Sequence, residues 1–93
     1  MSELARRIIA NNIRTKSKIL NLIRCNIETL PEELSECVWL EVLDIQRNNA
    51  INDLSVISGL VNLRKLILHD TQVNDLTPIS KLIRLEYLGC SGT

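Results

Sequence analysis

Apolar residues recur along this chain with a spacing of 22 or 23 residues. Segments beginning at Leu40, Leu63 and Leu85 superpose on one another, and a more divergent segment, Ser17–Trp39, precedes them. A fixed period of this length is typical of repeat architectures. The pattern therefore predicts four stacked units. Their bounds are 17–39, 40–62, 63–84 and, in part, 85–93.

Each unit opens with a short alternation of apolar and polar residues, which predicts a strand with one buried face. The buried strand positions are expected to be Leu20, Leu22, Leu40, Leu43, Ile45, Leu63, Leu66, Leu68, Leu85, Leu88 and Cys90. The rest of each unit returns on the far side and brings the next strand alongside, about 4.8 Å away. Further core positions on these returns are Ile27, Leu30, Leu34, Cys37, Ile51, Leu54, Ile57, Leu60, Val73, Leu76, Ile79 and Leu82. Because one unit cannot bury its leucines alone, neighbouring units must stack.

The shared positions resemble the leucine-rich repeat, L-x-x-L-x-L-x-x-N-x-I-x-x-L, over residues 17–93. The resemblance implies an α/β fold: a leucine-rich-repeat solenoid with a parallel β-sheet on one face and short helical, 3-10 or irregular returns on the other. Position nine of the repeat, normally Asn, is occupied by Cys25, Asn48, Thr71 and Thr93. Only Asn48 is expected to bond fully to the backbone inside its bend. One additional residue near Asn49 and Ala50 is interpreted as a local bulge.

Residues 3–13 predict an amphipathic helix that covers the first unit. The apolar face is expected to hold Leu4, Ile8 and Ile9, with Ala5 and Ile13 beside it, and the other face Arg6, Arg7 and Asn11. Ser2 is the expected N-cap. We therefore assign residues 1–16 to an N-terminal capping helix and its lead-in. The alternative is a helix that contacts a partner or a membrane surface.

The fourth unit ends at its ninth residue, before any return. Leu85, Leu88 and Cys90 are therefore expected to be partly uncovered, beside an unpaired strand edge. The pattern favours a longer repeat array of which this chain is a part. It also predicts self-association through the strand Leu85–Cys90.

Composition and charge narrow the range of functions. Aromatic residues make up 2% of the chain and the formal net charge is zero, so neither stacking platforms nor a basic field favour nucleic-acid binding. The charge is uneven: residues 1–24 carry a net +5, whereas Glu28–Asp44 contains six acids and no base. These stretches are interpreted as solvated faces, and the alternative for the basic helix is contact with anionic lipid or an acidic partner.

The sequence also predicts a location. No apolar segment reaches the roughly 18 residues that span a bilayer, and arginines and asparagines interrupt Leu4–Ile13, so no signal peptide is seen. The three cysteines show no close pair. An odd number of unpaired cysteines is most simply explained by reduced thiols in a reducing compartment, so we expect a cytoplasmic protein.

The outward strand residues are the predicted partner-binding face. They are Ile19, Asn21, Ile23, Val42, Asp44, Gln46, Lys65, Ile67, His69 and Tyr87. Exposed apolar groups among them suggest contact with a partner, although β-branched residues could be there only because they favour strands. Four strands span about 15 Å. This is too small to supply by itself the roughly 800 Å² that one partner contributes to a standard interface.

Catalysis is not expected. His69 is the only histidine, and its neighbour Asp70 should point to the opposite side of the strand. Cys25, Cys37 and Cys90 occupy core positions, which favours packing over a metal site or a nucleophile. Three glycines form no phosphate-binding loop. We therefore predict neither an enzyme nor a cofactor or metal site.

The units resemble two different classes of the leucine-rich repeat. The motif IETLPEEL at Ile27–Leu34 is similar to the 23-residue class, whereas INDLSVIS and VNDLTPIS are similar to the 22-residue class of bacterial internalins. The helix followed by KSKILNLIRCNIETLPEEL resembles the start of bacterial Roco-type proteins, in which repeats precede a GTPase and a dimerisation domain. The resemblance implies a protein-interaction module, either free-standing or the recognition or regulatory arm of a larger signalling protein such as a Roco-type GTPase. An internalin-like surface adhesin is disfavoured because no signal peptide is seen.

Overall fold

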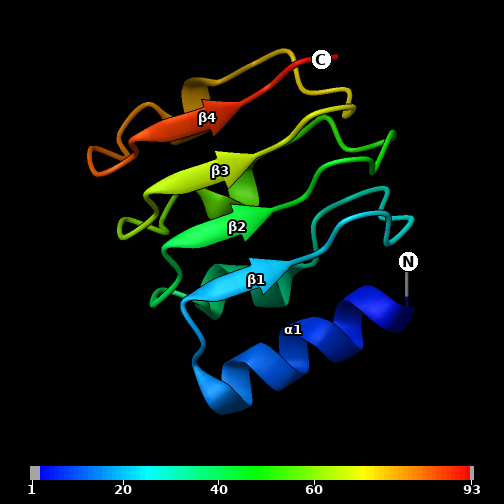
Figure 1. The fold of residues 1–93 in the computed structure, drawn as a ribbon, viewed down its shortest axis with the longest axis vertical. Coiled ribbons are helices and arrows are strands. Elements are labelled where there is room, and N and C mark those ends of the chain that lie inside the picture. The colour runs from blue at the N-terminus through cyan, green and yellow to red at the C-terminus, as the bar shows by residue number, and fades with distance from the viewer. Residues whose placement is uncertain (1–2, 93) are drawn as a thin grey trace.

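A computed structural model describes residues 3–92 as one helix followed by a four-stranded parallel sheet (Figure 1). The elements in chain order are α1 (Glu3–Thr15), β1 (Ile19–Asn21), the 3-10 helix η1 (Glu32–Glu36), β2 (Val42–Asp44), η2 (Ser55–Ile57), β3 (Lys65–Ile67), η3 (Thr77–Ile79) and β4 (Tyr87–Gly89). The predicted α/β class with a parallel sheet is confirmed. The predictions for Ser2 and Thr93 lie outside the described residues.

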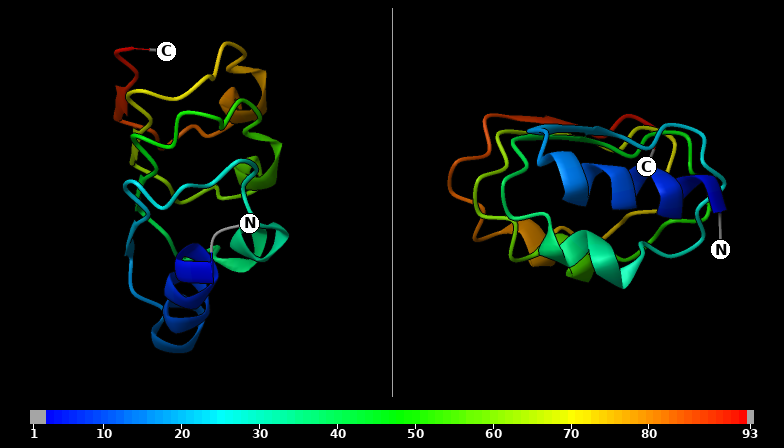
Figure 2. Two further views of the ribbon diagram at one scale, coloured as in Figure 1. Left: turned by 90° about the vertical axis from the view of Figure 1, so that its right-hand side faces the viewer. Right: turned by 90° about the horizontal axis from the view of Figure 1, so that it is seen from below.

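The strands lie in the order β1-β2-β3-β4, each parallel to the next. The register aligns Leu20, Leu43, Leu66 and Leu88 across the sheet. Two views at right angles place the sheet in one layer and the 3-10 helices in a second layer behind it (Figure 2). The aliphatic core fills the space between these layers, and its central residues are fully buried.

Asn48 fastens the bend between β2 and η2 to the bend before it. Its side-chain oxygen accepts hydrogen bonds from the backbone N–H groups of Cys25 (3.0 Å) and Ile27 (3.1 Å). Its amide donates to the carbonyls of Leu22 (2.9 Å) and Ile45 (2.8 Å). The predicted role of Asn48 is therefore confirmed, because all its polar atoms are satisfied in a buried position.

The equivalent residue Thr71 forms only local bonds, so the expected partial ladder is also confirmed. Its hydroxyl donates to the Leu68 carbonyl at 2.9 Å and accepts from the Val73 N–H at 3.5 Å. The additional residue at Asn49 and Ala50 is absorbed in an exposed turn, outside the strand register. The sheet therefore stays regular although the spacing changes by one residue.

Helix α1 covers the end of the sheet next to β1, but its buried face differs from the predicted one. Ala5 and Ile9 are buried, whereas Leu4 is 54% exposed. The prediction for Leu4 was wrong because the helix is turned so that Ala5, one residue further on, points to the core. Asn12, which the amphipathic pattern did not select, is buried instead.

Trp39 and Asn12 anchor α1 to the rest of the chain. The Trp39 indole N–H donates to Asn12 Oδ1 at 2.7 Å, and the Asn12 amide donates to the Ser17 carbonyl at 3.0 Å. Lys16 Nζ lies 4.8 Å from the centroid of the Trp39 ring, within the range of a cation–π contact. This cluster was not predicted, because Trp39 lies 27 residues from Asn12 in the chain.

The opposite end of the sheet is less covered. Leu85 and Leu88 are half-buried, which confirms that these leucines are partly uncovered. Cys90 is exposed, which agrees with the expectation that it is uncovered but not with its assignment to a core position. Leu76 is 42% exposed, so its assignment to the core was wrong. The reason is that β4 pairs only with β3, and no described segment packs beyond it. Among residues 3–92, no helix is long and apolar enough to cross a membrane.

Candidate partner-binding surface

The register of the sheet brings seven of the ten predicted residues onto one solvent-facing surface, and the other three follow at the strand ends. The surface formed by all ten is here called the sheet face. One row across the strands is Ile19, Val42, Lys65 and Tyr87, and the next is Asn21, Asp44, Ile67 and Gly89. A third row follows the strand ends, with Ile23, Gln46 and His69. None of the ten is buried in the core.

Apolar exposure is concentrated at the two ends of the first row. Ile19 is 63% exposed and Tyr87 is 48% exposed. Val42 and Ile67 are half-buried because strands flank them on both sides. Lys65 stands between Val42 and Tyr87 in this row. The sheet face is therefore a mixed surface with apolar ends, and the expected apolar exposure is larger at its ends than at its centre.

A row of alternating charges borders the sheet face where the strands begin. Lys18 Nζ lies 3.5 Å from a Glu41 carboxylate oxygen, and Arg64 Nε lies 3.7 Å from a Glu86 carboxylate oxygen. Lys18, Arg64 and Glu86 are well exposed and Glu41 is partly exposed, so each pair contributes at most about 1 kcal/mol to stability. Their main effect is to give this border a fixed pattern of charge.

His69 lies over Gly89, an arrangement that the sequence analysis missed. The backbone N–H of Ser91 donates to His69 Nδ1 at 2.8 Å, and the Ser91 hydroxyl lies 2.9 Å from the same nitrogen. A Cβ at position 89 would come within 2.8 Å of His69 Nε2 and 3.1 Å of the Tyr87 ring. The glycine therefore makes room for the imidazole, and a glycine in an outward strand position was the available signal.

Asp70 forms no ion pair with His69, but both residues lie in the turn after β3 and not in a strand, where His69 was predicted. The Asp70 carboxylate lies 3.9 Å from Arg47 Nε, and together with Arg24 and Asn49 these residues line an open polar hollow beyond the strand ends. Arg24, Arg47 and Asp70 have positive φ angles of 53°, 62° and 57°. Left-handed backbone costs an ordinary residue about 1–2 kcal/mol, so the bends after β1, β2 and β3 hold some strain.

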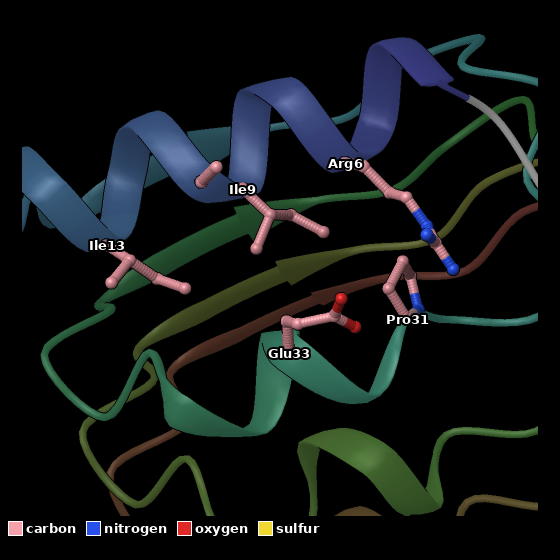
Figure 3. Close-up of a pocket in the computed structure, with 6 residues that line it drawn as sticks. Arg6, Ile9, Ile13, Pro31 and Glu33 are labelled. Carbon is pink, nitrogen blue, oxygen red and sulfur yellow. The ribbon is translucent and has the colours of Figure 1, made fainter.

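A second depression lies between α1 and η1 (Figure 3). Its volume is about 70 Å³, and its lining is Arg6, Ile9, Ala10, Ile13, Pro31 and Glu33. Pockets for small-molecule ligands are usually about 300–1,000 Å³. The depression is thus too small for a cofactor.

The two buried cysteines, Cys25 and Cys37, are placed for packing and not for thiol chemistry. Burial raises the pKa of the Cys25 thiol, and burial together with the nearby Glu36 carboxylate raises the pKa of the Cys37 thiol. A raised pKa keeps a thiol neutral and unreactive. Within residues 3–92, no group of three or more His, Cys, Asp or Glu side chains is placed to hold a metal ion.

No protein-family model matches this chain, and no curated protein matches it either. The function is therefore inferred from the geometry of the chain itself.

Proposed function

We propose that this chain is a leucine-rich-repeat module that binds a protein partner through the sheet face. The observation that carries the proposal is the parallel register, which aligns seven of the ten predicted residues in two rows on one surface. In such a module, α1 is the capping helix of the first repeat and the 3-10 helices are the returns. The in-register leucines and the spacing of 22 to 23 residues support this interpretation.

The chemistry of the sheet face suits a protein partner better than a small molecule. It is broad and mixed in polarity, and Tyr87 and Ile19 offer exposed apolar area at its ends. Tyrosine is among the residues enriched at interface hot spots. The surface is also limited, because the molecule measures only 30 × 27 × 17 Å. A partner is therefore expected to bind modestly here or to contact a further surface as well.

The test is affinity capture from the source cells, quantified by mass spectrometry, with the wild-type chain and two double variants as baits. The first variant, Ile67→Asp with Tyr87→Asp, places two charges on the sheet face. The matched control, Val61→Asp with Ile83→Asp, changes residues that are 55% and 92% exposed in the loops before β3 and β4. Circular dichroism establishes that both variants fold.

The proposal expects a set of proteins that the wild type and the control capture equally. The sheet-face variant should capture them at least about tenfold less, since two hot-spot losses of about 1 kcal/mol or more each act together. Equal capture by the sheet-face variant, or equal loss in both variants, would exclude the sheet face as the binding surface.

A further inference from the structure

Opposite charges lie on two elements at the α1 end of the molecule, away from the sheet face. The outward side of α1 carries the exposed bases Arg6, Arg7 and Arg14, with Glu3 as its single acid. The neighbouring 3-10 helix η1 carries the exposed acids Glu32, Glu33 and Glu36 and no base. The two elements pack side by side, and both face the viewer when the molecule is seen from below (Figure 2).

These charges are not used in ion pairs within the described chain. The three ion pairs among residues 3–92 join Lys18 to Glu41, Arg47 to Asp70 and Arg64 to Glu86, all along the sheet. On α1, the Arg14 guanidinium donates to the side-chain oxygen of Asn11, which is uncharged. The basic side of α1 and the acidic side of η1 thus both remain available to an external group of opposite charge.

The depression between α1 and η1 forms an apolar groove between two charged strips, the basic side of α1 and the acidic side of η1. Its walls are Ile9, Ala10, Ile13 and Pro31, while Arg6 from α1 and Glu33 from η1 stand at its rim. In the close-up, Arg6, Pro31 and Glu33 lie on the same half of the groove, and the two charged side chains extend towards it from opposite elements (Figure 3). An apolar centre with a charged rim is the usual anatomy of a protein interface.

We propose that this end of the molecule binds the same end of a second copy. A surface with one basic and one acidic strip is complementary to itself when a two-fold axis runs along the groove between them. That axis places α1 of each copy over η1 of the other, so that base meets acid twice. An axis across the groove would instead place α1 over α1, where bases oppose bases and raise the energy.

The geometry also predicts the strength of this dimer. The two shorter extents of the molecule are 27 and 17 Å. An end of these dimensions can bury at most roughly 450 Å² per copy, below the roughly 800 Å² per partner of a standard stable interface. The dimer is therefore weak and reversible. Because the exposed charges supply much of the attraction, high salt dissociates it.

A charge-swap experiment tests the proposal by sedimentation equilibrium on the full chain, from about 10 µM to about 1 mM protein. One variant carries Arg6→Glu and Arg7→Glu, and these acids suit the first turns of a helix. The other carries Glu32→Lys and Glu33→Lys. The control carries Lys81→Glu and Arg84→Glu, two exposed positions after η3, and changes the net charge by as much as the first variant. Circular dichroism of each variant verifies the fold.

The wild type and the control should dimerise at about 20 mM salt and dissociate at about 500 mM salt. Each double variant alone should show a dimer Kd raised about tenfold or more. The reason is that two charge pairs between α1 of one copy and η1 of the other become repulsive, and the same happens at the symmetric contact. An equimolar mixture of the two variants should recover wild-type association, because each reversed strip then faces its complement.

Three results would overturn the proposal. The first is a wild-type chain that stays monomeric at low salt throughout the concentration range. The second is a mixture of the two variants that associates no better than each variant alone. The third is association that survives both charge reversals but is lost in Leu88→Lys, which would place the contact at the open edge of β4.

Discussion

Asn48 is the single residue on which the most backbone groups depend. Replacing it with alanine leaves two buried N–H groups and two buried carbonyls without the partners they have in the wild type. A buried polar group without a partner costs about 1–3 kcal/mol. We therefore expect Asn48→Ala to lower the free energy of unfolding by about 3 kcal/mol or more, measured by urea denaturation.

Two substitutions calibrate that result. Thr71→Ala removes only local bonds and should cost about 1 kcal/mol. Asn49→Ala changes an exposed neighbour and should cost less than about 0.5 kcal/mol. If Asn48→Ala were no more harmful than Thr71→Ala, the bonds of Asn48 between bends would not contribute to stability.

The three thiols should differ in reactivity. In native protein at neutral pH, Cys90 should react rapidly with a thiol reagent because its side chain is exposed, whereas Cys25 and Cys37 should react slowly. Burial raises the pKa of both buried thiols above the ordinary value of 9.0, so folding favours their neutral form. This contribution to stability is complete below pH 9.0 and is lost as the pH rises through the raised values. Denatured protein, in which all three should react alike, is the control; rapid native labelling of Cys37 would contradict the prediction.

At the scale of elements, the docking of α1 depends on one indole. Trp39→Phe removes the donor to Asn12 Oδ1 and leaves a buried acceptor unpaired. The expected loss is about 1–3 kcal/mol in the free energy of unfolding, with faster amide exchange in α1 than elsewhere. Val38→Ala, at an exposed neighbouring position, is the control and should leave α1 protected. Uniform protection in Trp39→Phe would mean that apolar packing alone holds the helix.

The bend after each strand requires a left-handed backbone. Arg24, Arg47, Asp70 and Gly92 all adopt positive φ where the chain leaves the sheet. Only glycine does so without steric cost, and a Cβ at Gly92 would clash with an Asp70 carboxylate oxygen. The arginines adopt the same backbone because the neighbouring strands fix the direction of the bend. The backbone strain of these arginines therefore comes from the bend in which they lie, and their residue type does not predict it.

Across the whole molecule, stability should be graded from one end of the sheet to the other. Strands β2 and β3 are paired on both sides and lie over fully buried leucines, whereas β4 is paired on one side over half-buried ones. Hydrogen exchange at low protein concentration should therefore be slowest in β2 and β3 and fastest in β4. Protection of β4 that grows with concentration would support the predicted self-association through Leu85–Cys90. Strong protection at every concentration would contradict the gradient.

The core was predictable because its signal repeats. Leu43 and Leu66 recur at the same place in each segment, and every member of the predicted sheet face lies outside the core. Leu4 was predicted wrongly because a helical period leaves a wide apolar arc, and only docking selects which part of it is buried. The core assignments of Leu76 and Cys90 were wrong because their burial requires a neighbour on the far side of β4. The contact of His69 with Gly89 and Ser91 depends on strand register, which the sequence analysis did not assign.

The sequence by itself determined the α/β class, the period of the chain and most of the aliphatic core, because each follows from a pattern repeated at fixed spacing. The role of Asn48 followed from the resemblance of its unit to the leucine-rich repeat, in which that position is normally Asn. Only the tertiary structure decided which side of α1 is buried, that Trp39 bonds to Asn12, and that a basic helix lies beside an acidic 3-10 helix. These features join residues that no local pattern links. They depend on the angle and register at which the elements pack. All tertiary contacts together determine that angle and register.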